Sequence, residues 1–343
     1  MVLPANSLTF THMKKIITTL FFLIFISFLS VKVAAQEQAK PKSGEGVSAF
    51  LKRHGYTSKA AKEEFKQINK GKLTKDGGLM MGKTYRLPST STKGKSGKVG
   101  TVVTEPLFGK DLQKVTIKSN ELSGACLYLV SGHGGPDPGA IGRVNGRELH
   151  EDEYAYDIVL RLARSLMEKG AKVHIIIQDK KDGIRNDKFL SNSKRETCMG
   201  KAIPLDQTQR LRQRCDAINR LVKKDSEKYK RAIFVHVDSR RKKEQIDVFF
   251  YHAPNSKFGR RLANNIHQTV EAKYDKHQPN RGFTGTVSSR PLYVLRRSNP
   301  VATFLELGNI QNEKDRKRLV ISNNRQALAD WICQGVVKDF KNR

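Results

Sequence analysis

Apolar and polar positions divide residues 106–343 into alternating strand-like and helix-like segments. Short apolar runs are typical of buried strands, and they occur at residues 126–130, 172–178, 232–237, 247–251, 292–295 and 302–307. Apolar residues at helical spacing, such as Ile158, Leu162 and Leu166, predict helices at residues 151–169, 205–224, 258–274 and 323–341. This alternation predicts an α/β fold: a three-layer, doubly wound, mostly parallel sheet with helices on both faces.

The residues before this domain follow other patterns. Residues 44–88 place apolar residues at helical spacing between two short β-like ends, which predicts a small α+β domain. Residues 89–105 are rich in Ser, Thr, Gly and Lys without an apolar period, as is typical of a flexible linker. We therefore expect a small domain, a linker and a large domain at 106–343.

The N-terminus has the pattern of an export signal. Two lysines precede an apolar run at residues 16–29, and small residues follow up to Ala35. We expect residues 1–35 to be a signal peptide, with either Met1 or Met13 as the start. The apolar run is short for a membrane span, although an anchor is the alternative. Export would deliver the protein to a periplasm, or otherwise to the cell wall or the extracellular space.

Composition narrows the choice of partners. The chain has 64 Lys and Arg against 33 Asp and Glu, a formal net charge of +31. Such an excess indicates contact with a polyanion or an anionic surface, either nucleic acid or the polymers of a bacterial envelope. Export and the lack of any recognisable nucleic-acid motif argue against nucleic acid. We expect envelope polymers as the anionic partner and a monomeric protein.

The four cysteines fit no zinc-knuckle or redox-pair spacing. In an oxidising compartment they could form up to two disulfides, and the sequence leaves the pairing open. The residues concerned are Cys126, Cys198, Cys215 and Cys333.

Candidate chemistry lies where the predicted strands end. The first strand runs into a glycine-rich turn containing His133, which such a turn would present with little steric cover. Glu151 begins the next helix, a later strand carries His236, and the last core strand carries Glu306 between apolar neighbours. Active sites of open α/β sheets lie at the carboxyl ends of strands, so we expect these side chains to meet there.

Two histidines and one carboxylate are the ligand types of a catalytic zinc ion, which keeps a fourth position for water. Such a metal lowers the pKa of that water and polarises a carbonyl group. A further carboxylate can take the proton and pass it to a leaving nitrogen. Glu306 suits this role because its apolar strand would raise its pKa.

Each residue alone also has a structural interpretation. His133 or His236 could be a hydrogen-bonded structural histidine, and Glu306 could form a salt bridge with an arginine. Glu151 could simply favour the helix dipole, and Asp152 and Glu153 compete with it for any role as a ligand.

Taken together, the motifs resemble the zinc-dependent N-acetylmuramoyl-L-alanine amidases. The family's first motif is present as GHGGPDPGA, which implies that His133 is a zinc ligand. The helix EDEYAYDIVLRL matches the second motif with Glu151 as ligand and Glu153 as runner-up. The strand FVHVDS implies His236 as the third ligand, and FLELGNIQN implies Glu306 as the catalytic glutamate.

The resemblance spans residues 106–343 and has departures. Asp238 stands where the family usually has Asn, residues 180–204 look like a basic, polar insertion, and the role of Arg214 is open. The small domain at 44–88 separately resembles a LysM glycan-binding module, through GEGVSAFLKRHG, FKQIN and GKTYRLP.

The resemblance implies that the protein hydrolyses the amide bond between N-acetylmuramic acid and L-alanine of the peptidoglycan stem peptide. Two alternatives remain at this point. One is a zinc carboxypeptidase acting on the stem peptide, and the other is a non-catalytic wall-binding protein. Both would keep peptidoglycan as the partner.

Overall fold

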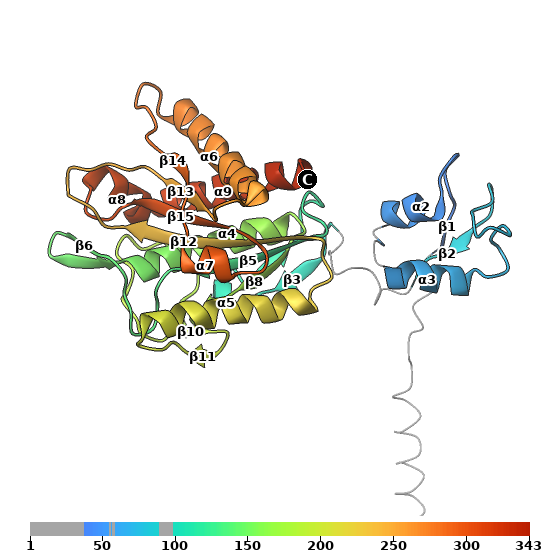
Figure 1. Ribbon diagram of the computed structural model, residues 1–343, viewed down its shortest axis with the longest axis horizontal. Helices are drawn as coiled ribbons and strands as arrows, with labels where there is room; N and C mark the ends of the chain where they lie inside the picture. The colour runs from blue at the N-terminus through green and yellow to red at the C-terminus, as the bar shows by residue number, and fades with distance from the viewer. Residues whose placement is uncertain (1–37, 55, 57–58, 89–98) are drawn as a thin grey trace, which may run out of the picture. The chain divides into compact units, whose positions relative to one another are not determined.

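Figure 1 shows the computed structural model of the chain, which describes residues 38–343 except residues 55, 57–58 and 89–98. Its contacts divide the chain into two compact units, Met1–Thr92 and Lys93–Arg343. The expected signal peptide and the first part of the expected linker lie outside the described residues. Among the described residues, no helix is both long and apolar enough to cross a membrane.

The first unit contains two short strands, which pair with each other, and two helices. β1 (Gln38–Ala39) is antiparallel to β2 (Tyr85–Arg86), and α2 (Val47–Arg53) and α3 (Lys59–Ile68) lie between them in the chain. The buried rings of Phe50 and Phe65 contact Tyr85 of β2. These aromatic contacts give the unit a hydrophobic core of its own.

The second unit is built on a six-stranded sheet in the order β14-β13-β15-β12-β5-β8. Its strands are β5 (Ala125–Ser131), β8 (Lys172–Ile175), β12 (Tyr229–Asp238), β13 (Phe249–His252), β14 (Thr286–Ser289) and β15 (Val301–Asn309). Neighbouring strands are parallel except β13 and β15, which are antiparallel. The mostly parallel sheet predicted from the alternating pattern is confirmed.

Helices cover both faces of this sheet (Figure 1). α4 (Glu151–Glu168), α6 (Lys257–His277) and α9 (Ser322–Lys341) contribute to one core, and α5 (Gln207–Lys224) and α7 (Tyr293–Arg297) contribute to the other. Successive side chains of a strand point to opposite faces. Leu127 and Leu129 of β5 accordingly join the first core, whereas Cys126 and Tyr128 join the second. This is the predicted three-layer arrangement.

Residues 292–295 are not the strand that their apolar run predicted. They contribute to α7, a short helix that begins at Tyr293 and contacts α5. Two consecutive residues, Val294 and Leu295, are both buried there, whereas a strand would turn them to opposite faces. A short apolar run cannot distinguish a strand from a buried helical turn.

The predicted strand at 172–178 also differs, because it is divided between two sheets. β8 ends at Ile175, and β9 (Ile177–Gln178) pairs instead with β10 (Thr197–Cys198), which pairs with β11 (Lys201–Ala202). The segment 180–204, which looked like an insertion, therefore contributes two strands, β10 and β11, to a small sheet that β9 completes.

Several short elements were not predicted. They are β3 (Val102–Thr104), η2 (Pro106–Phe108), β4 (Lys114–Thr116), the hairpin strands β6 (Ile141–Val144) and β7 (Arg147–His150), α8 (Glu313–Val320), and the strands β10, β11 and β14 already described. β3 pairs with β4 although it lies in the expected linker, so ordered structure of the second unit begins before Pro106. Asn145 and Gly146 both have positive φ at the turn between β6 and β7, as tight hairpins favour.

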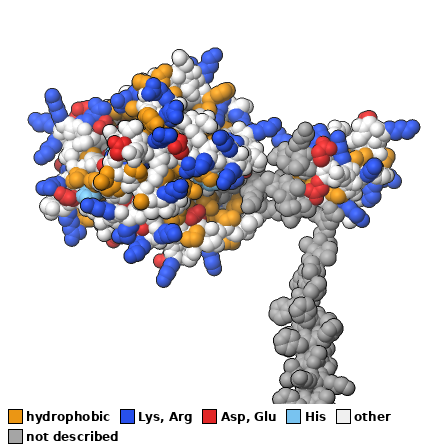
Figure 2. Space-filling model, turned by 60° about the horizontal axis from the view of Figure 1, so that its bottom comes forward, with side chains coloured by type: hydrophobic (Ala, Val, Ile, Leu, Met, Phe, Trp, Pro, Cys, Tyr) orange, Lys and Arg blue, Asp and Glu red, His pale blue; other side chains and the backbone are white. Residues whose placement is uncertain are grey.

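Positive charge is spread over the face of the protein visible in Figure 2, and its thiols are buried. Figure 2 shows Lys and Arg side chains spread over the visible face and not gathered in one patch. The four cysteines are free and buried, so the fold of the described residues is held without a disulfide.

A buried ionic network joins α4, α9 and the segment 180–204. The fully buried Arg325 donates to Asp157 Oδ2 at 2.6 Å and to the carbonyl oxygens of Arg185 and Asp187. Asp157 also accepts from Arg161. Removing Arg325 would leave Asp157 with Arg161 as its remaining guanidinium partner and would take a donor from the carbonyl oxygens of Arg185 and Asp187.

We predict that Arg325→Met lowers the free energy of unfolding by about 3–5 kcal/mol, because it breaks this buried network. Urea denaturation followed by circular dichroism would measure the change. The exposed Arg212 is the control, and Arg212→Met should shift stability by no more than about 0.5 kcal/mol. Equal denaturation midpoints for the two variants would contradict the prediction.

Candidate functional site

The site forms where three neighbouring strands and one helix end. β5, β12 and β15 are parallel neighbours, and Ser131 of β5 pairs with Val235 of β12. His133 therefore follows β5 at the same edge where β12 carries His236. Glu306 of β15 pairs directly with His236. Parallel register thus brings residues far apart in sequence to one edge of the sheet.

The turn after β5 needs its glycines because other site residues approach its backbone. A Cβ atom on Gly132 would lie 2.4 Å from the ring of His236, and one on Gly139 would lie 2.6 Å from Glu151 Oε2. His133 itself has φ 54°, a left-handed conformation that non-glycine residues seldom adopt. The turn therefore places the imidazole of His133 against these two partners.

His133, Glu151 and His236 converge on one point. One potential ligand atom from each lies within 4.8 Å of the other two. His133 Nε2 is 3.3 Å from Glu151 Oε2, and His236 Nδ1 is 2.9 Å from Glu151 Oε1. Two imidazole nitrogens and a carboxylate oxygen are donors that a transition metal such as zinc accepts.

Backbone groups hold the carboxylate of Glu151. It is 3 % exposed and accepts hydrogen bonds from the N–H groups of Ala140 (2.8 Å) and Val237 (3.0 Å). Burial opposes ionisation, but hydrogen bonds to His133 and His236 outweigh it and lower the pKa of Glu151. The group therefore stays ionised, as a metal ligand must.

Polar groups also support His133 from behind. Its Nδ1 lies 2.8 Å from Asp137 Oδ2, and Asp137 is paired with Arg210 at 2.7 Å. Arg214 donates to the backbone oxygen of His133. Burial would lower the pKa of His133, but hydrogen bonds to Asp137 and Glu151 raise it to about 10. Contact with Asp137 leaves Nε2 to face the other site residues.

His236 has a less polar setting. Its ring stacks on Phe304 with centroids 4.3 Å apart. Burial lowers its pKa, although the hydrogen bond to Glu151 partly opposes that effect. A neutral imidazole is the form that can donate a nitrogen lone pair to a metal.

Glu306 lies beside this group without a fixed partner. Its Oε2 atom is buried and has no hydrogen-bond partner among the described residues. Burial, the charge of Glu151 and the charge of Asp238 raise the pKa of Glu306 well above its ordinary value. A carboxyl group with a raised pKa is suited to exchange protons near neutral pH.

Asp152 and Glu153, the alternatives to Glu151 as a ligand, have other neighbours than the two histidines. Glu153 pairs with Arg185 at 3.0 Å and accepts from the backbone N–H of Ser193. It forms a separate buried acidic group with Asp152 and Glu196. The structure thus brings Glu151, and not Glu153, to the two histidines.

Sequence reasoning missed the groups that support the turn. Glu196 from the segment 180–204 accepts from the N–H of Gly135 at 2.8 Å. The contacts of Asp137 with His133 and Arg210 were also missed. The motif GHGGPDPGA contains Asp137, so the spacing of His133 and Asp137 could have indicated that pair. No local signal pointed to Glu196, because its partner lies 61 residues away.

Comparisons with known proteins identify similar chains. A protein-family model described as N-acetylmuramoyl-L-alanine amidase (Amidase_3) matches residues 127–338. The germination-specific N-acetylmuramoyl-L-alanine amidase of Bacillus subtilis is 24% identical over 226 residues, which are 65% of this chain and 82% of that protein. The "Probable cell wall amidase LytH" of Staphylococcus aureus is 25% identical over 225 residues, 64% of this chain and 60% of that protein.

Solved structures of similar proteins carry related descriptions. The CwlD amidase from Clostridioides difficile, solved in complex with the GerS lipoprotein, is 19% identical with a TM-score of 0.48, covering 64% of this chain and 100% of that one. N-acetylmuramoyl-L-alanine amidase AmiC2 of Nostoc punctiforme is 20% identical with a TM-score of 0.47, covering 65% and 99%.

Proposed function

The chain belongs to the N-acetylmuramoyl-L-alanine amidase family, and from that membership we propose that it cleaves peptidoglycan with a zinc ion held by His133, Glu151 and His236. The reaction of an N-acetylmuramoyl-L-alanine amidase is hydrolysis of the amide bond between N-acetylmuramic acid and the L-alanine of the stem peptide. Family membership favours this reaction over a carboxypeptidase or a non-catalytic wall-binding protein. The chain is a hydrolase that acts on the cell wall.

One observation carries the zinc proposal: three donor atoms from separate elements converge, and each donor has its own support. The set of two imidazoles and one carboxylate fits a catalytic zinc site with a free position. His133 has a carboxylate, Asp137, on its other ring nitrogen, which is the usual support of a histidine that binds zinc. The carboxylate of Glu151 is kept ionised by its surroundings.

The remaining chemistry follows from Glu306. When bound, zinc supplies a Lewis acid that polarises the scissile carbonyl group and makes water more acidic. As the oxygen of the attacking water bonds to the carbonyl carbon, Glu306 takes one proton from that water. The C–N bond then breaks, and Glu306 gives that proton to the leaving nitrogen. The products are a lactyl carboxylate on the sugar and a stem peptide with a free L-alanine amine.

Digestion of purified peptidoglycan by the full chain would test this function. Mass spectrometry should detect intact stem peptides that begin with L-alanine. A chelator should abolish their release, and added zinc should restore it. Peptides trimmed at their far end and still attached to glycan would overturn the proposal in favour of a carboxypeptidase.

Asp238 is predicted to set the working pH of Glu306. Its negative charge is among the causes that raise the pKa of Glu306, after burial and Glu151. Asp238→Asn removes that charge, so Glu306 should ionise at lower pH. Since a general base must be ionised to accept a proton, the acid limb of the kcat/KM profile should move to lower pH.

Measuring kcat/KM as a function of pH for the wild type and for Asp238→Asn would show this shift. Asp216→Asn is a control because Asp216 is an exposed residue of α5, paired with Arg212. It should leave the profile in place. A move of the acid limb to higher pH in Asp238→Asn would contradict the prediction.

The first unit is proposed to hold the enzyme on glycan as a LysM-like module. The motifs at 44–88 support this role, and the unit has its own core. Deleting residues 44–88 should reduce the fraction of protein that sediments with peptidoglycan and raise KM for insoluble wall, with little change in turnover of a soluble muropeptide. Unchanged sedimentation would contradict the role.

The same proposal includes export by residues 1–35 to a periplasm or the outer wall, where anionic polymers would meet the positive surface.

A further inference from the structure

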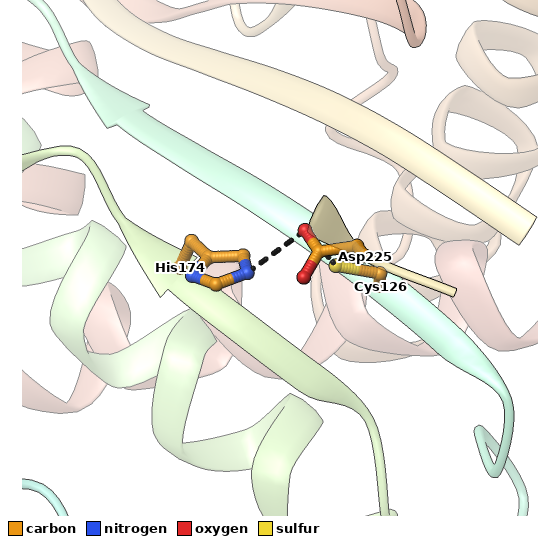
Figure 3. Close-up of side chains that lie close together, drawn as sticks. All are labelled: Cys126, His174 and Asp225. Carbon is orange, nitrogen blue, oxygen red and sulfur yellow. Dashed lines mark hydrogen bonds and ion pairs between the residues drawn. The ribbon is translucent and has the colours of Figure 1, made fainter. Parts of the chain in front are cut away.

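A second cluster of potential metal ligands lies toward the other end of β5, beside β8 and the end of α5. Figure 3 shows Cys126 of β5, His174 of β8 and Asp225, the residue that ends α5, with their polar atoms directed toward one another. The potential ligand atoms of the three lie within 4.8 Å of one another. We propose that this cluster binds a structural zinc ion; Glu227, which lies outside this group of three, would move toward the ion as the fourth ligand.

The distances between the ligand atoms suit zinc. Cys126 Sγ is 3.5 Å from Asp225 Oδ2, and His174 Nε2 is 3.0 Å from the same oxygen. In a tetrahedral site with bonds of about 2.3 Å to sulfur and about 2.0 Å to nitrogen and oxygen, these separations would be about 3.5 Å and 3.3 Å. Cys126 and His174 therefore already lie at suitable distances from Asp225 Oδ2.

The cluster has one more carboxylate than its hydrogen bonds use. Glu227 has a side chain that is 10 % exposed, and its Oε2 is buried without a hydrogen-bond partner among the described residues. This Oε2 atom lies 3.8 Å from the ammonium of Lys172. That same ammonium lies 2.5 Å from Asp225 Oδ1, which places Glu227 beside the cluster. An unused buried oxygen at this place is what a fourth ligand would supply.

Neighbouring groups would orient the ligands. Lys172 pairs with the Oδ1 atom of Asp225, so Oδ2 is the oxygen that faces Cys126 and His174. Tyr128 donates to Oδ2 at 2.6 Å, and its ring stacks on His174 with centroids 5.3 Å apart. Such outer contacts fix the orientation of ligands in zinc sites.

Charge favours a divalent cation here. With its thiol ionised, Cys126 would join Asp225 and Glu227 in contributing three negative charges, which zinc and the Lys172 ammonium would offset. A second ammonium, that of Lys230, already binds the last carbonyl oxygens of α5. A thiolate ligand selects zinc over calcium or magnesium, which take oxygen ligands.

The position indicates a structural and not a catalytic role. Cys126 lies five residues before the end of β5 at Ser131, about 16 Å of strand, whereas His133 follows that end. The ion would join the edge strand β8 to β5 and to the end of α5. It would stabilise this edge without touching the substrate, so the inference does not depend on the amidase proposal.

Cobalt spectroscopy on the metal-free full chain would test the site. Cobalt(II) should give the near-ultraviolet charge-transfer absorption of a cobalt–thiolate bond, because one ligand is sulfur, while the His133 group contains none. The absorption should persist in His236→Ala, which removes a ligand of the other site, and vanish in Cys126→Ala. Cys333→Ala is the matched control, since it also removes a buried thiol and should keep the absorption.

The number of bound zinc ions gives a second measurement. It is compared across several variants, so it does not depend on whether one of them folds. The wild type should bind two zinc ions, and Cys126→Ala and His236→Ala one each. Zinc should raise the melting temperature of His236→Ala, and this rise should vanish when Cys126→Ala is added. Absence of thiolate absorption in the cobalt-loaded wild type, or its survival in Cys126→Ala, would overturn the proposal. A zinc count of one that falls to zero in His236→Ala would do the same.

Discussion

Glu306→Gln will lower the rate of amide cleavage by about 10²–10⁴-fold, the contribution typical of a positioned acid–base group. Glutamine keeps the shape and the amide cannot accept and return a proton as a carboxylate does. Glu306 is not among the three converging donors, so the variant should bind as much zinc as the wild type. Activity and metal content should therefore separate in this variant.

The same substitution should not destabilise the metal-free protein. Burial raises the pKa of Glu306 in the folded state above its unfolded value, so the folded state binds the proton more tightly. Stability from this group is present below the unfolded pKa and is lost as pH rises toward the folded pKa. At pH 7 glutamine removes that cost, and Glu306→Gln should be at least as stable as the wild type.

Single-turnover release of L-alanine amines, zinc analysis and thermal unfolding in chelator would measure these three quantities. Glu313→Gln, at the start of α8, is the control, since Glu313 lies outside the converging group. It should retain activity. If Glu306→Gln cleaved the amide at the wild-type rate, Glu306 would not be the proton carrier.

The layers of the fold could be predicted from sequence because they follow from local periodicity. The long helix α4 shows a clear apolar stripe, and β5 and β15 are mostly apolar. α7 could not be predicted in the same way, because its few apolar residues fit a strand equally well and only contact with α5 makes them helical. Short elements depend on tertiary contacts that no local window contains.

The candidate site likewise contains residues that could be predicted from sequence and residues that could not. His133, His236 and Glu306 could be predicted because strand ends of a parallel sheet meet at one edge. The choice between Glu151 and Glu153 is decided in space: Glu151 is held by the N–H groups of Ala140 and Val237, and Glu153 is held by Arg185. Cys126, His174 and Asp225 gave no signal at all, because their spacing in sequence matches no motif. The pairing of β5 with β8 brings Cys126 and His174 together, and the end of α5 adds Asp225.

His236→Ala should remove one equivalent of zinc and reduce amide cleavage to the limit of detection. Loss of a direct ligand should weaken zinc binding by more than the roughly 10–100-fold that loss of an outer partner costs. The loss should also leave Glu151 Oε1 without one of its two hydrogen-bond partners, since Val237 N–H would remain alone. The remaining histidine and carboxylate form an incomplete site.

His267→Ala is the matched control for this experiment. The side chain of His267, in α6, is 18 % exposed against 17 % for His236, and its Nε2 bonds the backbone oxygen of Gly285. Both variants lose a half-buried imidazole, so their cost in stability should be similar, while only His236→Ala should lose zinc and activity. Zinc analysis of the dialysed proteins and peptidoglycan digestion at matched folded fraction would decide. If His236→Ala kept its full zinc content, the metal would have to be held elsewhere, and Glu306 would lie beside a histidine with a purely structural role.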